Sequence, residues 1–290
     1  MPDPDSSPTG PRTVVVTGAS SGIGAAVVKR LDGAGYRVFA GVRKVSDGEA
    51  LRQGGSERIV PLLLDVTDAA AIREAARAVR EATGTEGLDG LVSNAGIGSS
   101  GPLEFVPPEE MRHVLEVNLV GSLAVAQAFL PMLRSKRGGI VFVGSMSGRY
   151  GGPMLGAYVA SKFGLEGMAD VLRREVRRWH VRVCLVEPGP VATRIWEKAR
   201  ADARATRSRL PPEANALYGA DLDAIPRRVD REESIAAPVE QVADVVAKAL
   251  TVPRPKARYP VGKGMKTAAL FLRLAPDRFV DWMSRRREGG

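Results

Sequence analysis

The sequence has few of the residues from which metal sites, disulfides and hydrolytic triads are built. It contains one cysteine and two histidines, and the histidines, His113 and His180, are far apart in the chain. This scarcity argues against a histidine-based zinc site and against a Ser–His–Asp hydrolase, so no metal is expected. Cys184 lies in the apolar run 181–186 and has no partner for a disulfide within the chain. We therefore interpret it as a buried thiol in a reducing, cytoplasmic compartment.

The chain also lacks long apolar runs and a signal-like N-terminus. No apolar run reaches the length of a membrane span, and the Pro-, Asp- and Ser-rich residues 1–11 predict a disordered tail. The net charge is +9, but residues 254–290 hold ten Lys/Arg and three Asp/Glu. The rest of the chain is nearly neutral, so nucleic-acid binding is not indicated.

The sequence does contain a regular alternation of short apolar runs with helical patterns. The predicted strands are 13–16, 36–42, 59–64, 88–92, 140–143, 181–187 and an edge strand at 258–261. The predicted helices between them are 25–34, 69–82, 109–133, 158–178 and 239–251. This order predicts one α/β domain over residues 12–264, a Rossmann-type doubly wound parallel sheet with helices on both faces.

A glycine-rich turn connects the first predicted strand to the first predicted helix. Its spacing is Gly-x-x-x-Gly-x-Gly, and glycine there allows a tight turn and close approach of the backbone to a ligand. The helix that follows offers amide donors and a positive dipole to a pyrophosphate. The predicted dinucleotide contacts in this turn are Gly18, Ser20, Ser21, Gly22, Ile23 and Gly24.

The end of the second strand bears on cofactor choice. An NAD-specific site would carry Asp or Glu there for the ribose hydroxyls, whereas this chain has Val42 followed by Arg43 and Lys44. Arg43 can pair with a 2′-phosphate through charge-assisted hydrogen bonds. The sequence therefore favours NADP(H) and leaves NAD(H) open.

Tyr158 and Lys162 lie four residues apart on a predicted helix and so share one face. A phenol is a poor acid–base catalyst at neutral pH unless a cation stabilises its phenolate. A charge about 5 Å away, at an effective dielectric near 20, supplies roughly 3 kcal/mol, or about two pKa units. Lys162 is therefore expected to lower the pKa of Tyr158. Ser145, at the end of the fifth strand, can hydrogen-bond the same substrate oxygen.

Two later segments are less regular. Residues 194–238 are charged and irregular, and we interpret them as a substrate lid, with a disordered surface insertion as the alternative. Residues 265–290 form a basic, amphipathic tail, with a helix expected from Met265 to Arg287. Such a helix packs on its own domain or on a second subunit, or lies at a membrane surface.

These motifs together resemble the short-chain dehydrogenases/reductases, in their compact branch, and most closely the 17β-hydroxysteroid and retinol dehydrogenase-like group. The residues that carry the resemblance are Gly18, Gly22, Gly24, Asp65, Asn94, Ala95, Gly96, Asn118, Ser145, Tyr158, Lys162, Pro188 and Gly189. The resemblance implies a catalytic group of Ser145, Tyr158, Lys162 and Asn118, in which Asn118 holds a water of a proton relay. A structural amide is the alternative for Asn118.

The resemblance also implies contacts to the cofactor beyond the glycine turn. Asp65 and Val66 would contact adenine, and Asn94, with Ala95 and Gly96, the adenosine-side ribose region. Pro188, Gly189, Val191 and Thr193 would lie along the nicotinamide, and Thr193 would bond its carboxamide. Tyr158 and Lys162 would also contact the cofactor, and Lys162 would hold the nicotinamide ribose.

We therefore expect an oxidoreductase that transfers hydride between a nicotinamide cofactor and a lipophilic secondary alcohol or ketone, of steroid, retinoid or long-chain type. The predicted substrate pocket is lined by Ile97, Tyr150, Met154, Leu155 and Trp196. A reductase of small or acyl-bound 3-oxo substrates is one alternative, and a non-catalytic NADP-sensing protein is another. The expected partners are a small lipophilic substrate and further copies of the chain, in a dimer or tetramer. Weak membrane-surface contact through residues 265–290 is a further expectation.

Overall fold

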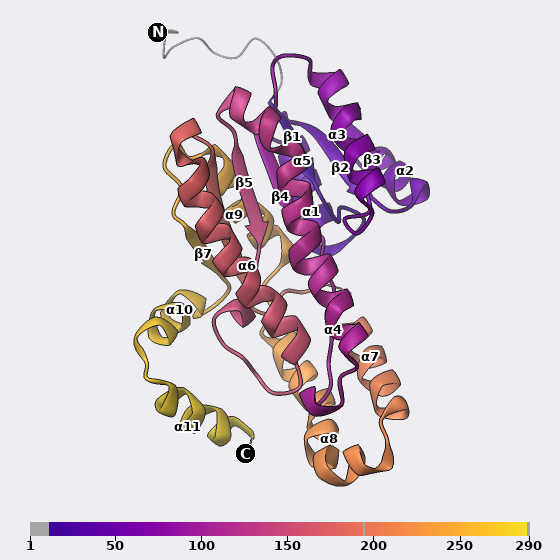
Figure 1. Ribbon diagram of the computed structural model, residues 1–290, viewed down its shortest axis with the longest axis vertical. Coiled ribbons are helices and arrows are strands. Elements are labelled where there is room, and N and C mark those ends of the chain that lie inside the picture. The colour runs from indigo at the N-terminus through magenta and orange to yellow at the C-terminus, as the bar shows by residue number, and fades with distance from the viewer. Residues whose placement is uncertain (1–11, 194, 289–290) are drawn as a thin grey trace.

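The computed structural model describes residues 12–193 and 195–288. The tail predicted at residues 1–11 lies outside the described residues. A seven-stranded sheet runs through the centre of the molecule (Figure 1), in the order β3-β2-β1-β4-β5-β6-β7, and neighbouring strands are parallel. The strands are β1 (Thr13–Val16), β2 (Arg37–Val42), β3 (Ile59–Leu63), β4 (Gly90–Ser93), β5 (Gly139–Val143), β6 (Arg182–Pro188) and β7 (Arg258–Val261). The predicted doubly wound sheet, including its edge strand, is confirmed.

Helices cover both faces of the sheet, because successive side chains of each strand point to opposite faces. Val14 and Val16 belong to one apolar core, and Val15 between them belongs to the other. The first core includes residues of α1 (Gly22–Asp32), α2 (Val45–Gln53) and α9 (Val239–Thr251). The second includes residues of α3 (Ala69–Thr83), α5 (Gly121–Lys136) and α6 (Gly156–Glu175). The helix α2 was not predicted, and its buried residues are only Gly48 and Leu51.

The strand order reverses between β1 and β4, and this reversal positions the site. In open parallel sheets, ligands bind beyond the carboxyl ends of the strands at such a reversal. Gly18 follows β1, Asn94 follows β4 and Ser145 follows β5, so their chain segments converge on the same edge.

The helix predicted over 109–133 is longer than expected and is not uniform. It consists of α4 (Pro108–Leu115), a π-helical turn η2 (Glu116–Val120) and α5, which together span 29 residues. By length and composition alone this helix could cross a membrane, so the expectation that no segment reaches that length was wrong. Its residues Val114, Val125 and Phe129 are buried within the molecule, which is typical of a core helix.

The segment predicted as irregular at 194–238 is mostly helical. It forms α7 (Ile195–Arg209) and α8 (Pro212–Ser234), which extend beyond the carboxyl end of the sheet next to α4 (Figure 1). A small apolar core holds them, formed by Met154, Trp196, Leu222, Ile225 and Val229. The helical spacing of the buried apolar residues was not recognised in the sequence, because these residues are few and lie among many charged ones along two long helices.

The C-terminal helix predicted over 265–287 is divided into two. The helix α10 (Met265–Leu274) ends before Pro276, and α11 (Asp277–Glu288) begins after it. Proline lacks the backbone N–H that would continue the helix, which explains the break. Cys184 is buried as predicted, and burial raises the pKa of its thiol to about 12.

Candidate active site

The glycine turn after β1 is shaped by close backbone contacts. Gly18 and Gly22 have φ angles of 62° and 55°, in the left-handed region that favours glycine. A Cβ at Gly18 would lie 2.8 Å from the Cα of Ala95, and one at Gly24 would overlap the carbonyl oxygen of Gly18. The three glycines are therefore required by the path of the chain itself. The turn leads directly into the N-terminus of α1, whose first turn has no acidic residue and whose N-cap, Ser21, makes no side-chain capping bond.

Asn94 supports this turn from the neighbouring strand. Its Nδ2 donates to the carbonyl oxygens of Thr17 and Gly18, at 3.0 Å each. In return, the Thr17 hydroxyl accepts from the backbone N–H groups of Asn94 (2.9 Å) and Ala95 (3.1 Å). The side chain predicted to contact the ribose region is thus engaged in fixing the glycine turn. The open α1 N-terminus and the glycine cradle are suited to a dinucleotide pyrophosphate.

Arg43 and Asp65 lie at the outer part of the same edge. Arg43 is exposed directly after β2, and Asp65 is half-buried after β3. The Asp65 carboxylate accepts from the backbone N–H (2.9 Å) and the hydroxyl (2.7 Å) of Thr67. These hydrogen bonds lower the pKa of Asp65, and the charge of Arg43 lowers it further. The two residues are therefore close enough to interact, while Val66 beside them is buried.

Ser145, Tyr158 and Lys162 come together beyond β5. The Ser145 hydroxyl caps the short helix η3 (Met146–Gly148) by accepting from the Ser147 N–H at 3.1 Å. A side-chain hydrogen bond also joins Ser145 to Tyr158. Lys162 is buried, its Nζ lies 5.8 Å from the centre of the Tyr158 ring, and it donates to the Val143 carbonyl at 3.0 Å.

Burial governs the ionisation of this group. It raises the pKa of Tyr158, opposed by the hydrogen bond with Ser145 and reinforced by the charge of Glu232 on α8. Lys162 does not contribute to this shift, and its ammonium donates to the Val143 carbonyl, so the lowering of the Tyr158 pKa by Lys162 stays a prediction. Burial also lowers the pKa of Lys162 to about 8, against the charge of Glu166. Lys162 therefore remains largely protonated at neutral pH.

Asn118 is buried in the π-helical turn, and its side chain makes three hydrogen bonds to protein. Its Oδ1 accepts from the N–H of Ile97 (2.8 Å), while Nδ2 donates to the Ile97 carbonyl and to the Ser161 hydroxyl, both at 2.9 Å. These bonds fix the loop after β4 to the helix that carries Lys162. A Cβ added at Gly96 in that loop would lie 3.8 Å from the Lys162 Nζ. Both amide hydrogens of Asn118 are thereby used, whereas Oδ1 accepts one of the two hydrogen bonds that a carbonyl oxygen can accept.

The segment after β6 returns to the glycine turn. Pro188 ends β6, Gly189 donates its N–H to Val261 (2.9 Å), and Val191 is buried. A Cβ at Gly22 would lie 3.3 Å from Cγ2 of Thr193, so the predicted carboxamide-binding residue adjoins the turn.

The five residues predicted to line the substrate pocket differ in their surroundings. Met154 and Trp196 are buried in the core under α8, and the Trp196 Nε1 donates to the Val191 carbonyl at 2.8 Å. The other three, Ile97, Tyr150 and Leu155, are half-buried. Trp196 therefore anchors α7 to the main domain.

Sequence reasoning missed a buried ionic cluster behind Ser145. Glu187 is fully buried at the end of β6, and Arg149 donates to both of its carboxylate oxygens, at 2.7 and 3.0 Å. Arg258 on β7 donates to Glu166 at 2.7 Å and lies 3.8 Å from Glu187. The position of Glu187 at the end of the apolar strand β6 was the available signal, because a carboxylate buried there needs a cation beside it. Nothing in the sequence indicates which arginines supply it.

Residues 12–204 match the family described as short chain dehydrogenase. The chain is also 37% identical over 277 residues to the NADPH-dependent 3-dehydrocapnine reductase of Ornithobacterium rhinotracheale, covering 93% of this chain and 95% of that protein. The chain belongs to the short-chain dehydrogenase family. It is therefore an NAD(P)-dependent oxidoreductase that acts on CH–OH groups or the corresponding carbonyls.

Two further comparisons agree with this membership. The chain is 36% identical over 285 residues to retinol dehydrogenase 5 of Mus musculus, covering 96% of this chain and 89% of that protein. A short chain dehydrogenase of Burkholderia cenocepacia J2315, solved in complex with NADP, is similar with a TM-score of 0.70 and 28% identity, over 93% of this chain and 95% of that one. The resemblance to retinol dehydrogenase-like members is confirmed.

Proposed function

We propose that this short-chain dehydrogenase is an NADP(H)-dependent enzyme of lipophilic alcohols or ketones, with Tyr158 as its proton-transfer residue. The observation that carries the proposal is the grouping of Ser145, Tyr158 and Lys162 beyond β5, at the edge to which the glycine turn also belongs. The nicotinamide supplies or accepts the hydride when it is bound. The orientation of the substrate and the transfer of the proton are carried out by side chains of the protein.

Each residue of this group has a separate task. Ser145 donates a hydrogen bond to the substrate oxygen and so orients it toward the phenol. In reduction the Tyr158 hydroxyl donates its proton to that oxygen, and in oxidation the phenolate accepts the proton as hydride leaves the carbinol carbon. Lys162 supplies a positive charge one helical turn away, and this charge opposes the effect of burial by favouring the phenolate. Asn118 keeps the loop after β4 against the Lys162 helix.

Two features support NADP(H) and a lipophilic substrate. Arg43 is exposed at the end of β2, where a 2′-phosphate would need a cation, and one relative is named as NADPH-dependent. Another relative is named as a retinol dehydrogenase, and the predicted pocket residues Ile97, Met154 and Leu155 are apolar. A reductase of small or acyl-bound 3-oxo substrates is the second candidate, and one relative is named as a reductase of a 3-dehydro compound.

The test is a substrate screen in which nicotinamide absorbance is followed with NADPH, NADH and their oxidised forms. The panel contains retinoids, steroids, long-chain alcohols and ketones, and short 3-oxo esters. We expect turnover with lipophilic members and a preference for the phosphorylated cofactor. Turnover restricted to the short 3-oxo esters would favour the second candidate. Tight NADPH binding without turnover of any compound would favour a non-catalytic sensor.

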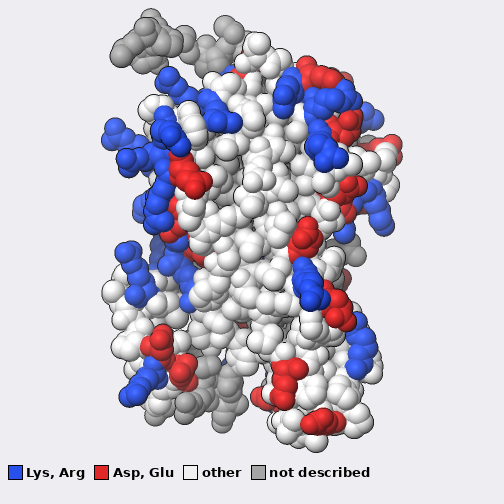
Figure 2. Space-filling view, in the orientation of Figure 1, with Lys and Arg blue, Asp and Glu red and all other residues white. Residues whose placement is uncertain are grey.

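We also propose that the protein forms a dimer through α5 and α6. Figure 2 shows that the centre of this face is largely free of charge, with charged side chains toward its edges. Val120 at the end of η2, and Phe163 and Val171 on α6, are 45%, 46% and 51% exposed. Sedimentation velocity of the wild type against Phe163→Glu tests the proposal, since a buried carboxylate would dissociate the dimer. A monomeric wild type would refute it.

Contact with a membrane surface through α10 and α11 is a further proposal. Leu270, Leu274, Phe279 and Trp282 are exposed there, in a segment rich in Lys and Arg. The test is sedimentation with liposomes, and Leu270→Ser together with Leu274→Ser should reduce the bound fraction. Cytoplasmic location remains a prediction.

A further inference from the structure

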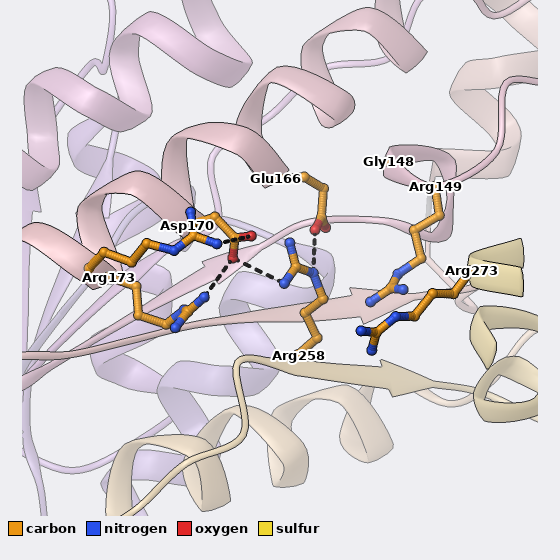
Figure 3. Close-up of a pocket in the computed structure, with 8 residues that line it drawn as sticks. Gly148, Arg149, Glu166, Asp170, Arg173, Arg258 and Arg273 are labelled. Atoms are coloured by element: carbon orange, nitrogen blue, oxygen red, sulfur yellow. Dashed lines mark hydrogen bonds and ion pairs between the residues drawn. The ribbon is translucent and has the colours of Figure 1, made fainter.

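A pocket of about 520 Å³ lies further along α6 than the turn that carries Tyr158 and Lys162. Five arginines line it, and they come from four separate parts of the chain: Arg149, Arg173, Arg174, Arg258 and Arg273. Arg149 follows the loop that begins at Ser145, while Arg258 comes from β7 and Arg273 from α10 (Figure 3). Such a concentration of guanidinium groups around one opening is not required by the dehydrogenase chemistry.

The carboxylates near the pocket do not balance these arginines. Asp170 accepts from Arg258 at 3.0 Å and Arg173 at 3.2 Å, and Arg174 lies 3.6 Å from it. The remaining two acids are Glu166 and Glu187, which pair with Arg258 and Arg149. Five arginines thus share three carboxylates, which leaves a positive surplus.

Arg273 is the least compensated member of the cluster. No ion pair or hydrogen bond joins its side chain to another of the residues 12–193 and 195–288 that the structure describes. In Figure 3 its guanidinium group points into the same space as that of Arg149. Arg149 is already paired with Glu187, whereas the exposed guanidinium of Arg273 has no carboxylate beside it among the described residues. An anion in this space would therefore meet the charge of Arg273 without a competing acid, next to the further positive charge of Arg149.

A second observation comes from the pocket wall. Glu166 is 8% exposed and its Oε2 accepts from Arg258, while its carboxyl group also adjoins that of the buried Glu187, with which it shares a hydrogen bond when one of the two is protonated. Burial and the neighbouring Glu187 raise the pKa of Glu166 to about 7. Near neutral pH this carboxyl group therefore carries a proton for part of the time, and the positive surplus of the pocket increases.

We propose that this arginine pocket binds a tetrahedral oxyanion of the phosphate or sulfonate type. Guanidinium groups match the oxygens of such an anion through paired, charge-assisted hydrogen bonds, and arginine is the residue best suited to this recognition. The oxyanion has two sources, a free anion or the head group of a lipid. The exposed Leu270 and Leu274 flank Arg273 on α10, where the chains of a lipid would lie.

The first arm of the test uses inorganic sulfate and the full chain saturated with NADPH, so that the cofactor's own phosphate sites are filled. Calorimetry is carried out on the wild type, Arg273→Gln and Arg278→Gln. Arg278 is an exposed arginine of α11 that does not line the pocket, so its variant has the same net charge as Arg273→Gln. We expect Arg273→Gln to weaken sulfate binding about tenfold and Arg278→Gln to leave it unchanged.

The second arm uses vesicles of phosphatidylcholine with or without phosphatidylglycerol, sedimented with the same three proteins. Loss of binding to the anionic vesicles in Arg273→Gln but not in Arg278→Gln identifies a lipid head group as the source. Sulfate binding without this difference identifies a free anion. Equal losses in both variants, or no binding of either probe by the wild type, overturn the proposal. Because Arg273 has no ion pair to lose, unchanged thermal unfolding of its variant is expected and serves as the folding control.

Discussion

The two sides of the sheet's carboxyl edge are held in place by different kinds of interaction. On the side of β1 to β4, the glycine turn is formed by backbone groups that approach one another closely, with Asn94 as the main side-chain support. On the side of β5 to β7, Arg149, Glu166, Glu187 and Arg258 form a buried ionic cluster behind the reactive tyrosine. The first side has no room for added atoms at its glycines, and the second depends on a cation for its fully buried Glu187.

The comparison separates two ways in which a site is kept rigid. Steric contact in the glycine turn depends on distances between atoms of neighbouring segments, and it is insensitive to pH. The ionic cluster depends on the protonation of Glu166 and on arginines from distant segments, so it responds to pH and to any change of charge. Four substitutions test this division.

The largest expected effect is on catalysis at the β5 side. Tyr158→Phe removes the only group placed to exchange a proton with the substrate in this proposal, so kcat should fall by about 10²- to 10⁴-fold. NADPH affinity should be nearly unchanged, because the glycine turn lies on the other side. Tyr36→Phe is the control, since Tyr36 bonds Arg12 rather than the site. Steady-state kinetics with a substrate from the screen provide the measurement, and near-normal turnover would remove Tyr158 from its role.

The second substitution breaks the ionic cluster directly. Among the described residues, Arg149→Ala leaves Arg258, at 3.8 Å, as the one cation beside the fully buried Glu187. Loss of one partner of a buried ion pair costs about 3–5 kcal/mol of unfolding free energy. The exposed pair of Arg30 and Asp244 supplies the control, because Arg30→Ala should cost less than about 1 kcal/mol. Denaturant unfolding measures both. Similar costs for the two variants would contradict the importance assigned to burial.

The third substitution tests the response of the cluster to pH. The folded-state pKa of Glu166 is raised to about 7 from 4.5, so between these values the folded protein binds more protons than the unfolded chain. Its contribution to stability is therefore fully present below pH 4.5 and is lost as the pH rises through 7. From pH 5 to 8 the wild type should lose up to about 3 kcal/mol relative to Glu166→Gln. Thermal unfolding of both proteins across this range measures the difference, and parallel curves would exclude a raised pKa.

The smallest expected effect concerns the other side of the edge. Arg43→Ala should shift the ratio of NADPH to NADH affinity about tenfold toward NADH, because one charge-assisted contact to the 2′-phosphate is lost. Arg52→Ala, also an exposed arginine, lies at the end of α2 and should leave the ratio unchanged. Cofactor titrations followed by fluorescence give both ratios. An unaltered ratio in Arg43→Ala would mean that another group selects the cofactor.

Local patterns in the sequence predicted most of the framework. Each of the seven strands was expected close to where it occurs, because apolar runs bounded by glycine and charge are a local signal. The division of the C-terminal helix at Pro276 was visible in principle and was overlooked. The helices α7 and α8 could not be predicted from local patterns, because their burial around Trp196 depends on Met154, which belongs to a distant loop.

The sequence by itself determined the parallel sheet, the glycine turn and the pairing of Tyr158 with Lys162, since these follow from spacing along a strand, a turn and a helix. Only the tertiary structure decided that Lys162 is directed to the Val143 carbonyl, that Asn118 is hydrogen-bonded to Ile97 and Ser161, and that five arginines surround one pocket. The physical reason is that burial and long-range electrostatics are properties of the packed chain. A side chain's neighbours in space, rather than in sequence, fix its hydration and its charge.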